Sequence, residues 1–191
     1  MKPIKEDRRV RMTKLILRDS LLELMKKKSI NKITSTEICR QADINRNTFY
    51  SHYSSPYDLL IQIENALYEE IRQSIEQSLK AENISALLLE ICQSIVKNGE
   101  LCRIMFSDHG DKDFLKRIIY IAHDKSIAEW KSYTRHSDTD QLELLYTFTA
   151  NGSVAIIQDW VQTGMKTPPG EIARFIEKAS NHGLEAFLSP R

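Results

Sequence analysis

Hydrogen-bonding side chains crowd the stretch "NRNTFYSH" at residues 45–52. An arginine can donate two hydrogen bonds to guanine O6 and N7, and an asparagine can pair with adenine N6 and N7. Hydroxyl groups, and the free N–H groups at a helix start, suit phosphate oxygens. The stretch therefore carries the chemistry of nucleic-acid recognition. The candidate residues are Arg46, Asn47, Thr48, Tyr50 and Ser51.

Two short helices have to position these side chains. Thr34 can cap the first, over residues 34–42, because Glu37 three positions later completes a capping box. Asn45 is a natural cap for the second, over residues 46–53. Two such helices, joined by a tight turn and packed on a preceding helix, predict a helix-turn-helix.

The turn and the two faces of the second helix follow from the same residues. Asp43 suits a left-handed turn position, which few residues other than glycine tolerate. A small bundle with a merely polar surface is the alternative. His52 has two interpretations, a DNA contact or a half-buried ring bonded to the backbone, while Tyr50 suits the groove. The residues predicted to face inward are Ile38, Ala42, Ile44, Phe49 and Tyr53.

The rest of the chain is helical in its periodicity, so the fold class is all-α with about nine helices. Ser55 caps a long helix, with Pro56 at its first position and Asp58 completing a capping box. In the first helix, the apolar stripe comprises Ile16, Leu17, Leu21, Leu24 and Met25. The predicted helices span residues 9–28, 34–42, 46–53, 56–80, 84–97, 100–107, 112–134, 139–164 and 169–188.

Charge is distributed unevenly along the 191 residues, although the net charge is only +1. Residues 1–54 hold 13 Lys/Arg against 6 Asp/Glu, and residues 55–191 hold 14 against 20. The basic end is suited to a polyanion. The alternative is an ordinary solvated lysine-rich face, as "MKKKS" at 25–29 would be at a helix end.

Several protein classes are disfavoured. No apolar run reaches the roughly 18 residues of a membrane span, and the N-terminus lacks the apolar centre of a signal peptide. The three cysteines show no metal-ligand spacing, which together with the missing signal favours a reducing cytoplasm. No catalytic or phosphate-binding motif is present. We therefore expect no metal, no cofactor and no enzymatic activity.

Residues 10–60 resemble the DNA-binding domain of TetR/AcrR-type transcriptional regulators, through the pattern "IT…EI…A…R.TFY.HY…..DLL". The sequence departs from that family at Asp43, where glycine is usual, and at Asn45, where serine is common. Pro56 stands where a phosphate-contacting lysine is frequent, so that contact is expected to be missing. The resemblance implies phosphate contacts near Thr34, Ser35 and Thr36, and groove or backbone contacts by Arg46, Asn47, Thr48, Tyr50 and His52.

The resemblance also implies two domains, residues 1–54 for DNA binding and 55–191 for dimerisation and effector binding. Gly152 in mid-helix costs about 1 kcal/mol relative to alanine, which a close helix approach would explain. Stripes that pack only within one chain are the alternative. The interface candidates are Gly152, Ile156, Trp160, Phe175, Ala179 and Gly183.

A small, mostly apolar effector could bind among the helices over residues 84–134. Core packing is the alternative for each candidate, and the pocket could be absent altogether. The candidates are Cys92, Met105, Phe106, His123, Trp130 and Tyr133.

These patterns together predict a homodimeric, sequence-specific regulator, most simply a repressor, whose partner is double-stranded DNA with a near-palindromic operator. The alternative is a co-regulator of the same family type that acts through protein contacts without binding DNA. The proline at position 56 leaves room for it.

Overall fold

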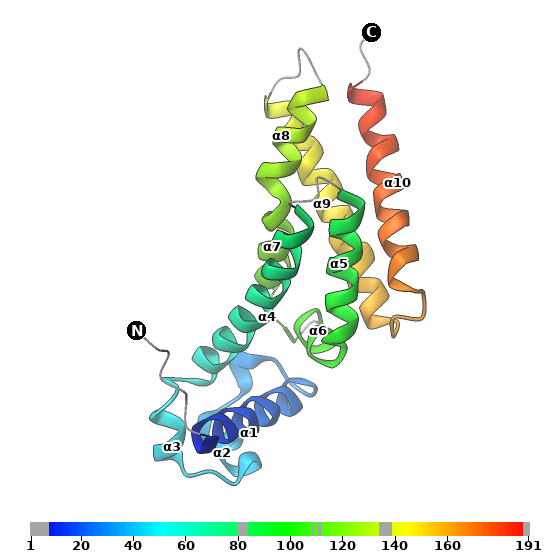
Figure 1. Ribbon diagram of the computed structural model, residues 1–191. Coiled ribbons are helices and arrows are strands. Elements are labelled where there is room, and N and C mark those ends of the chain that lie inside the picture. Colours follow the sequence, from blue (N-terminus) through cyan, green and yellow to red (C-terminus); the bar gives the residue numbers. More distant parts are fainter. Residues whose placement is uncertain (1–7, 80–83, 108, 111, 134–138, 189–191) are drawn as a thin grey trace. The chain divides into compact units, whose positions relative to one another are not determined.

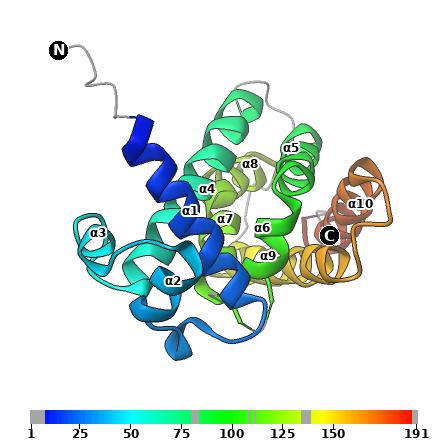
Figure 2. The same ribbon diagram turned by 90° about the horizontal axis from the view of Figure 1, so that it is seen from below.

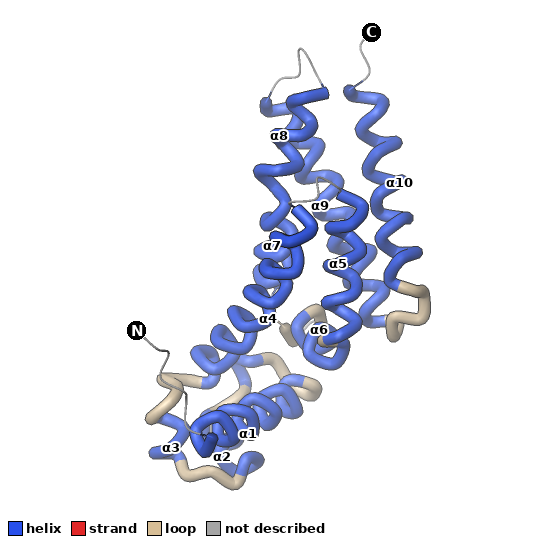
Figure 3. Tube along the Cα trace, in the orientation of Figure 1, coloured by secondary structure: helices blue, strands red, loops and turns tan. Residues whose placement is uncertain are grey.

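The computed structural model describes residues 8–79, 84–107, 109–110, 112–133 and 139–188. The chain divides into two compact units, residues 1–67 with 108–110 and residues 68–107 with 111–191. The predicted functional boundary between residues 54 and 55 stays a prediction. Every regular element of the described part is helical, with ten α-helices and two short 3-10 turns (Figures 1 and 3). The all-α prediction is confirmed.

The first unit is built from α1 (Arg8–Met25), a 3-10 turn at Ile30–Lys32, α2 (Ser35–Ala42), α3 (Arg46–Tyr50) and the beginning of α4 (Pro56–Leu79). Figure 2 shows α1, α2 and α3 together on its left side. Their apolar side chains, together with those at the start of α4, form a buried core. Its fully or almost fully buried members are Leu17, Leu21, Met25, Ile38, Phe49, Leu59 and Leu60.

The buried stripe of α1 is narrower than predicted. Leu17, Leu21 and Met25 recur every four residues and are all 0% exposed. Ile16 was expected in that stripe but is 41% exposed, because it lies about 100° around the helix from Leu17. The prediction for Ile16 was therefore wrong.

The start of α4 follows the predicted cap with one change. The Asp58 N–H donates to Ser55 Oγ at 3.0 Å, which confirms Ser55 as the cap. The Asp58 carboxylate, however, accepts hydrogen bonds from the backbone N–H and the hydroxyl of Ser54, at 2.8 and 3.0 Å. The carboxylate thus holds the residue before the cap, and the expected bond back to Ser55 is replaced.

The second unit contains the rest of α4, α5 (Ile84–Lys97), α6 (Gly99–Met105), α7 (Lys112–Ile119), a 3-10 turn (Tyr120–Ala122), α8 (His123–Tyr133), α9 (Thr139–Gln162) and α10 (Pro169–Leu188). Helix α10 packs along α5 and also contacts α9, while α8 packs on α9 (Figures 1 and 2). A single helix over residues 112–134 was predicted. The 3-10 turn divides it, and that turn places Tyr120 and His123, three residues apart, on one face.

Helix α9 ends in a motif that requires an unusual backbone. Gly164 has φ +92°, and its N–H donates to the Val161 carbonyl at 3.2 Å. The Met165 N–H donates to the Trp160 carbonyl at 2.8 Å. These two bonds form a Schellman motif, in which glycine is favoured because it has no Cβ to clash. In the described part of the chain, no helix is long and apolar enough to cross a membrane.

Candidate nucleic-acid interface

The first helix of the predicted pair begins at the predicted cap. The Glu37 N–H donates to Thr34 Oγ1 at 3.3 Å, and the Thr34 N–H donates to Glu37 Oε2 at 3.0 Å, so the capping box is confirmed. Lys28 Nζ lies 2.6 Å from Glu37 Oε1. The hydrogen bond from Lys28, followed by those from Thr34, lowers the pKa of Glu37 to about 2. A carboxylate that remains charged therefore holds the start of α2.

The turn between α2 and α3 also has its predicted geometry. Asp43 has φ +52° and ψ +44°, the left-handed conformation, and caps the end of α2. The Asn47 N–H donates to Asn45 Oδ1 at 2.8 Å, which confirms Asn45 as the cap of α3. Asp43 thus performs the turn without a glycine.

The inward face of this helix-turn-helix is buried as predicted. Phe49 is 0% exposed and lies against Tyr53, with ring centroids 5.7 Å apart. Ile38, Ala42 and Tyr53 are likewise buried, whereas Ile44 is only half-buried. Phe49 therefore anchors α3 from behind and fixes which of its residues face solvent.

The nine candidate DNA-contacting residues occupy three environments. Thr34, Thr36, Arg46, Asn47, Tyr50 and Ser51 are exposed, and Thr48 and His52 are half-buried. Ser35 is buried, at 9% exposure. Its hydroxyl lies 2.7 Å from the Tyr50 hydroxyl, which brings the start of α2 and the end of α3 together.

The predicted interface residues of α9 and α10 differ in exposure. Gly152 is exposed, and a Cβ added there would meet no atom of the described part of the chain within 4 Å. Phe175 is 59% exposed and Ala179 is exposed, whereas Ile156 is half-buried. The surroundings of Gly183 lie outside the described part.

Two further apolar residues on the outer face of α9 were not predicted from the sequence as interface residues. Leu144 is 72% exposed and Phe148 is 75% exposed, four positions apart on one side of the helix. They could have been identified from the sequence, because α9 carries apolar residues on more than one face. The buried face contains Leu142, Leu145 and Tyr146, which are only some of the apolar residues of α9.

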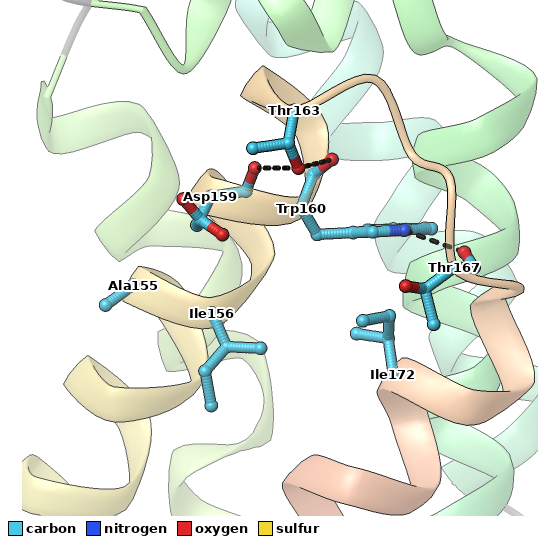
Figure 4. Close-up of a pocket in the computed structure, with 7 residues that line it drawn as sticks. All are labelled: Ala155, Ile156, Asp159, Trp160, Thr163, Thr167 and Ile172. Carbon is cyan, nitrogen blue, oxygen red and sulfur yellow. Dashed lines mark hydrogen bonds between the residues drawn. The ribbon is translucent and has the colours of Figure 1, made fainter.

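A surface pocket of about 330 Å³ lies between α9 and α10. Figure 4 shows Ile156 and Ile172 on opposite sides of it, with the Trp160 ring across one end. Trp160 is 4% exposed, and its Nε1–H donates to the Thr167 carbonyl at 2.8 Å. Among the predicted interface residues, Trp160 thus holds its own chain's α9–α10 connection.

The predicted effector-pocket residues are placed mostly in the interior of the second unit. Cys92, Met105, Phe106 and Trp130 are buried, and burial raises the pKa of the Cys92 thiol to about 12. The structure brings two of the set around one ring. The His123 ring centroid lies 4.7 Å from that of Tyr146, and the Trp130 centroid lies 6.0 Å from it. The side chain of Tyr133 is outside the described part.

The His123 ring is also engaged by carboxylates. Its Nε2 lies 2.8 Å from Glu143 Oε2, and its Nδ1 lies 2.8 Å from Asp124 Oδ1. Within the described residues, no group of three or more metal-binding side chains is arranged to hold an ion. The contact between His123 and Glu143 forms a clamp that joins α8 to α9.

Comparison with known proteins identifies the C-terminal part of the chain. The family model TetR_C_8, for a transcriptional regulator C-terminal region, matches residues 82–182, more than half of the sequence. Among curated proteins, none matches.

Solved structures share the fold over nearly the whole chain. A TetR transcriptional regulator from Streptococcus agalactiae 2603V has a TM-score of 0.68 at 20% identity, covering 92% of this chain and 97% of that one. NalD from Pseudomonas aeruginosa, the secondary repressor of the MexAB-OprM multidrug efflux pump, has a TM-score of 0.64 at 15% identity, covering 91% and 97%. The dihydroxyacetone kinase operon activator DhaS has a TM-score of 0.55 at 19% identity, covering 93% and 98%.

Proposed function

The chain belongs to the TetR family of transcriptional regulators, and from that premise we propose that it binds DNA sequence-specifically as a homodimer and represses transcription. The family model matches the C-terminal region only, so the DNA-binding part of the proposal depends on the first unit. The observation that carries it is the orientation of α3. Phe49 is fully buried behind the helix, while Arg46 and Asn47 are exposed in front.

That orientation suits a major groove, which is wide enough to admit a helix. Arg46 and Asn47 are the two residues with bidentate base-reading chemistry, for guanine and adenine respectively. Both stand in the first turn of α3, the part of a recognition helix that reaches base edges. We assign base readout to them.

Phosphate contacts are assigned to the residues around this helix. Thr34 and Thr36 are exposed at the start of α2, and Ser51 is exposed at the end of α3. Arg8, Arg9 and Arg11 are exposed on α1, while the preceding Lys2 and Lys5 lie outside the described residues. These cations are proposed to replace the lysine contact that Pro56 cannot make, because proline has neither charge nor N–H.

The homodimer is proposed to form through the outer faces of α9 and α10. Leu144, Phe148 and Phe175 are large apolar side chains that are 59–75% exposed, which is costly unless another surface covers them. Gly152 lies on α9 with open space in front of it, so among the described residues no neighbouring helix explains the glycine. A second copy, related by a two-fold axis, would cover both helices with the same patch.

Two-fold symmetry in the protein has a counterpart in the operator. Two α3 helices would read half-sites about 34–36 Å apart, or a multiple of it, in a near-palindromic sequence. A dimer bound there excludes other proteins from the same DNA, which is why we propose repression. NalD is a repressor and DhaS is an activator, so the shared fold alone does not decide between repression and activation.

Release by a small apolar effector completes the proposal. The effector would bind the second unit and favour one of two dimer conformations, which requires only a difference in affinity between them. His123 and Trp130, which both lie against the Tyr146 ring, are the two members of the predicted pocket set that lie together. They are the first positions at which to test effector binding.

Selection of bound sequences from random DNA by the purified protein tests the central proposal. Enrichment of a two-fold symmetric motif, with the affinity falling steeply as salt rises, is expected because phosphate contacts release counterions. Absence of any enriched sequence from protein that is folded and dimeric would contradict it. That result would favour the co-regulator that acts through protein contacts.

A further inference from the structure

A hydroxyl pair joins the two helices of the helix-turn-helix. Ser35 is the first residue of α2 and Tyr50 is the last residue of α3, and their hydroxyl oxygens are 2.7 Å apart. Ser35 is 9% exposed, whereas Tyr50 is 48% exposed. One end of the Tyr50 side chain is therefore fixed on α2, while much of the ring remains at the surface.

Arg46 lies beside this pair. It stands four positions before Tyr50, which places both on the same side of α3. The guanidinium carbon of Arg46 is 5.8 Å from the centroid of the Tyr50 ring, within the range of a cation–π contact. The hydrogen bond with Ser35, and secondly the nearby guanidinium group of Arg46, lower the pKa of Tyr50. Ser35 thus contacts the hydroxyl of Tyr50, and Arg46 contacts its ring.

The Tyr50 ring is also held by its neighbour in the core. Its centroid is 5.4 Å from that of Phe49, with the two rings perpendicular. Phe49 is fully buried, so this contact fixes the base of the Tyr50 side chain as Ser35 fixes its tip. The ring has little freedom left, although it is half exposed.

We infer that Tyr50 is a positioning residue that directs Arg46 toward its base, and that Ser35 sets the position of Tyr50. An arginine side chain loses much rotamer freedom when it makes a bidentate contact, and a preset direction reduces that loss. Base preference at the position read by Arg46 therefore depends on the hydroxyl pair. This consequence rests on the proposed DNA binding, whereas the linkage among the three side chains does not.

A double-mutant cycle on DNA separates positioning from general support. Tyr50→Phe keeps the ring and removes the hydroxyl. In the native background it should lower the preference for the selected base over its replacements by several-fold, toward the value of Arg46→Ala. In the Arg46→Ala background the same change should alter that preference by less than about twofold, because there is no arginine left to position. Equal loss in both backgrounds would overturn the inference.

Tyr57→Phe is the matched control, because it removes the same hydroxyl from a tyrosine of similar exposure, 50%, on α4. It should leave base preference unchanged. Circular dichroism of each variant shows whether the helices are intact. Ser35→Ala should reproduce the change in base preference seen with Tyr50→Phe, and combining the two should add little.

A measurement on the free protein distinguishes failure of this inference from failure of DNA binding. With carbon-13 at the Cζ of tyrosine, and Tyr50→Phe to assign the signal, NMR gives the Tyr50 pKa directly. Ser35→Ala and Arg46→Ala should each raise it toward the ordinary value of 10.0. If neither does, the linkage is refuted even where DNA binds. If both do and no DNA binds, the proposed function fails while the linkage stands.

Discussion

The Nε2 atom of His123 and a carboxylate oxygen of Glu143 lie 2.8 Å apart, which ties α8 to α9. Asp124 holds the other ring nitrogen at 2.8 Å, and the Tyr120 and Tyr146 rings flank the imidazole. Two carboxylates on one imidazole favour its charged form. The hydrogen bond with Glu143, followed by that with Asp124, accordingly raises the pKa of His123 above its ordinary 6.5.

This clamp predicts a pH dependence of stability. Because the folded pKa of His123 is raised, its contribution is fully present below pH 6.5 and is lost as pH rises through the raised value. Urea denaturation across that range should show the native protein losing stability that His123→Gln does not lose. Glu143→Gln, which removes the main cause of the shift, should reduce the slope as well. A native slope unchanged by either substitution would refute the clamp.

The Glu37 carboxylate predicts the opposite dependence at acid pH. Its folded pKa is lowered from 4.5 to about 2, so its contribution is present above pH 4.5 and is lost as pH falls toward 2. In Glu37→Gln, the melting temperature should vary less with pH over that interval. Thr34→Ala, which removes the cap, should cost about 1 kcal/mol at neutral pH. Identical acid profiles for the native protein and Glu37→Gln would contradict the assignment.

Arg46→Ala should cost about 1–3 kcal/mol on the selected DNA and relax base preference at one position of each half-site. The physical reason is the loss of two hydrogen bonds to one guanine. Fluorescence anisotropy on the selected site and on its single-base variants measures both effects. A loss that is equal on all DNA sequences would instead assign Arg46 to a phosphate.

Gly152 distinguishes chain stability from association. Gly152→Ala should stabilise α9 by about 1 kcal/mol, since its Cβ meets none of the residues that the structure describes. If the partner chain packs against the glycine, Gly152→Leu should weaken the dimer in sedimentation equilibrium. Gly170→Ala is the control, because its Cβ would make only an ordinary contact, 3.8 Å from Leu89. Unchanged association in Gly152→Leu would exclude Gly152 from the interface.

Gly164→Ala should destabilise the second unit by about 1–2 kcal/mol, because φ +92° is strained for a residue with a Cβ. Gly164→Asn should cost less, since asparagine tolerates left-handed conformations better than alanine. Thermal denaturation of the two variants measures the difference. If Gly164→Ala lowers stability and Gly152→Ala raises it, the backbone conformation at each glycine determines the effect of the substitution on stability.

Local rules read from the sequence described the helix-turn-helix well. Thr34, Asp43 and Asn45 each act on the backbone within a few residues, so their capping and turn roles follow from residue type and spacing. The burial of Phe49 follows from helical periodicity for the same reason. The break in the predicted helix over residues 112–134 was missed, because no proline or glycine marks it.

What the sequence determined by itself was the all-α class, the caps and turn of the helix-turn-helix, and which residues of α3 face outward, because these depend on interactions over a few positions. Only the tertiary structure decided that Ser35 meets Tyr50, that His123 meets Glu143, and that Leu144 and Phe148 face solvent. These relationships depend on how whole helices pack. An apolar residue on a two-sided helix has the same local pattern whether its own chain or open solvent lies opposite it.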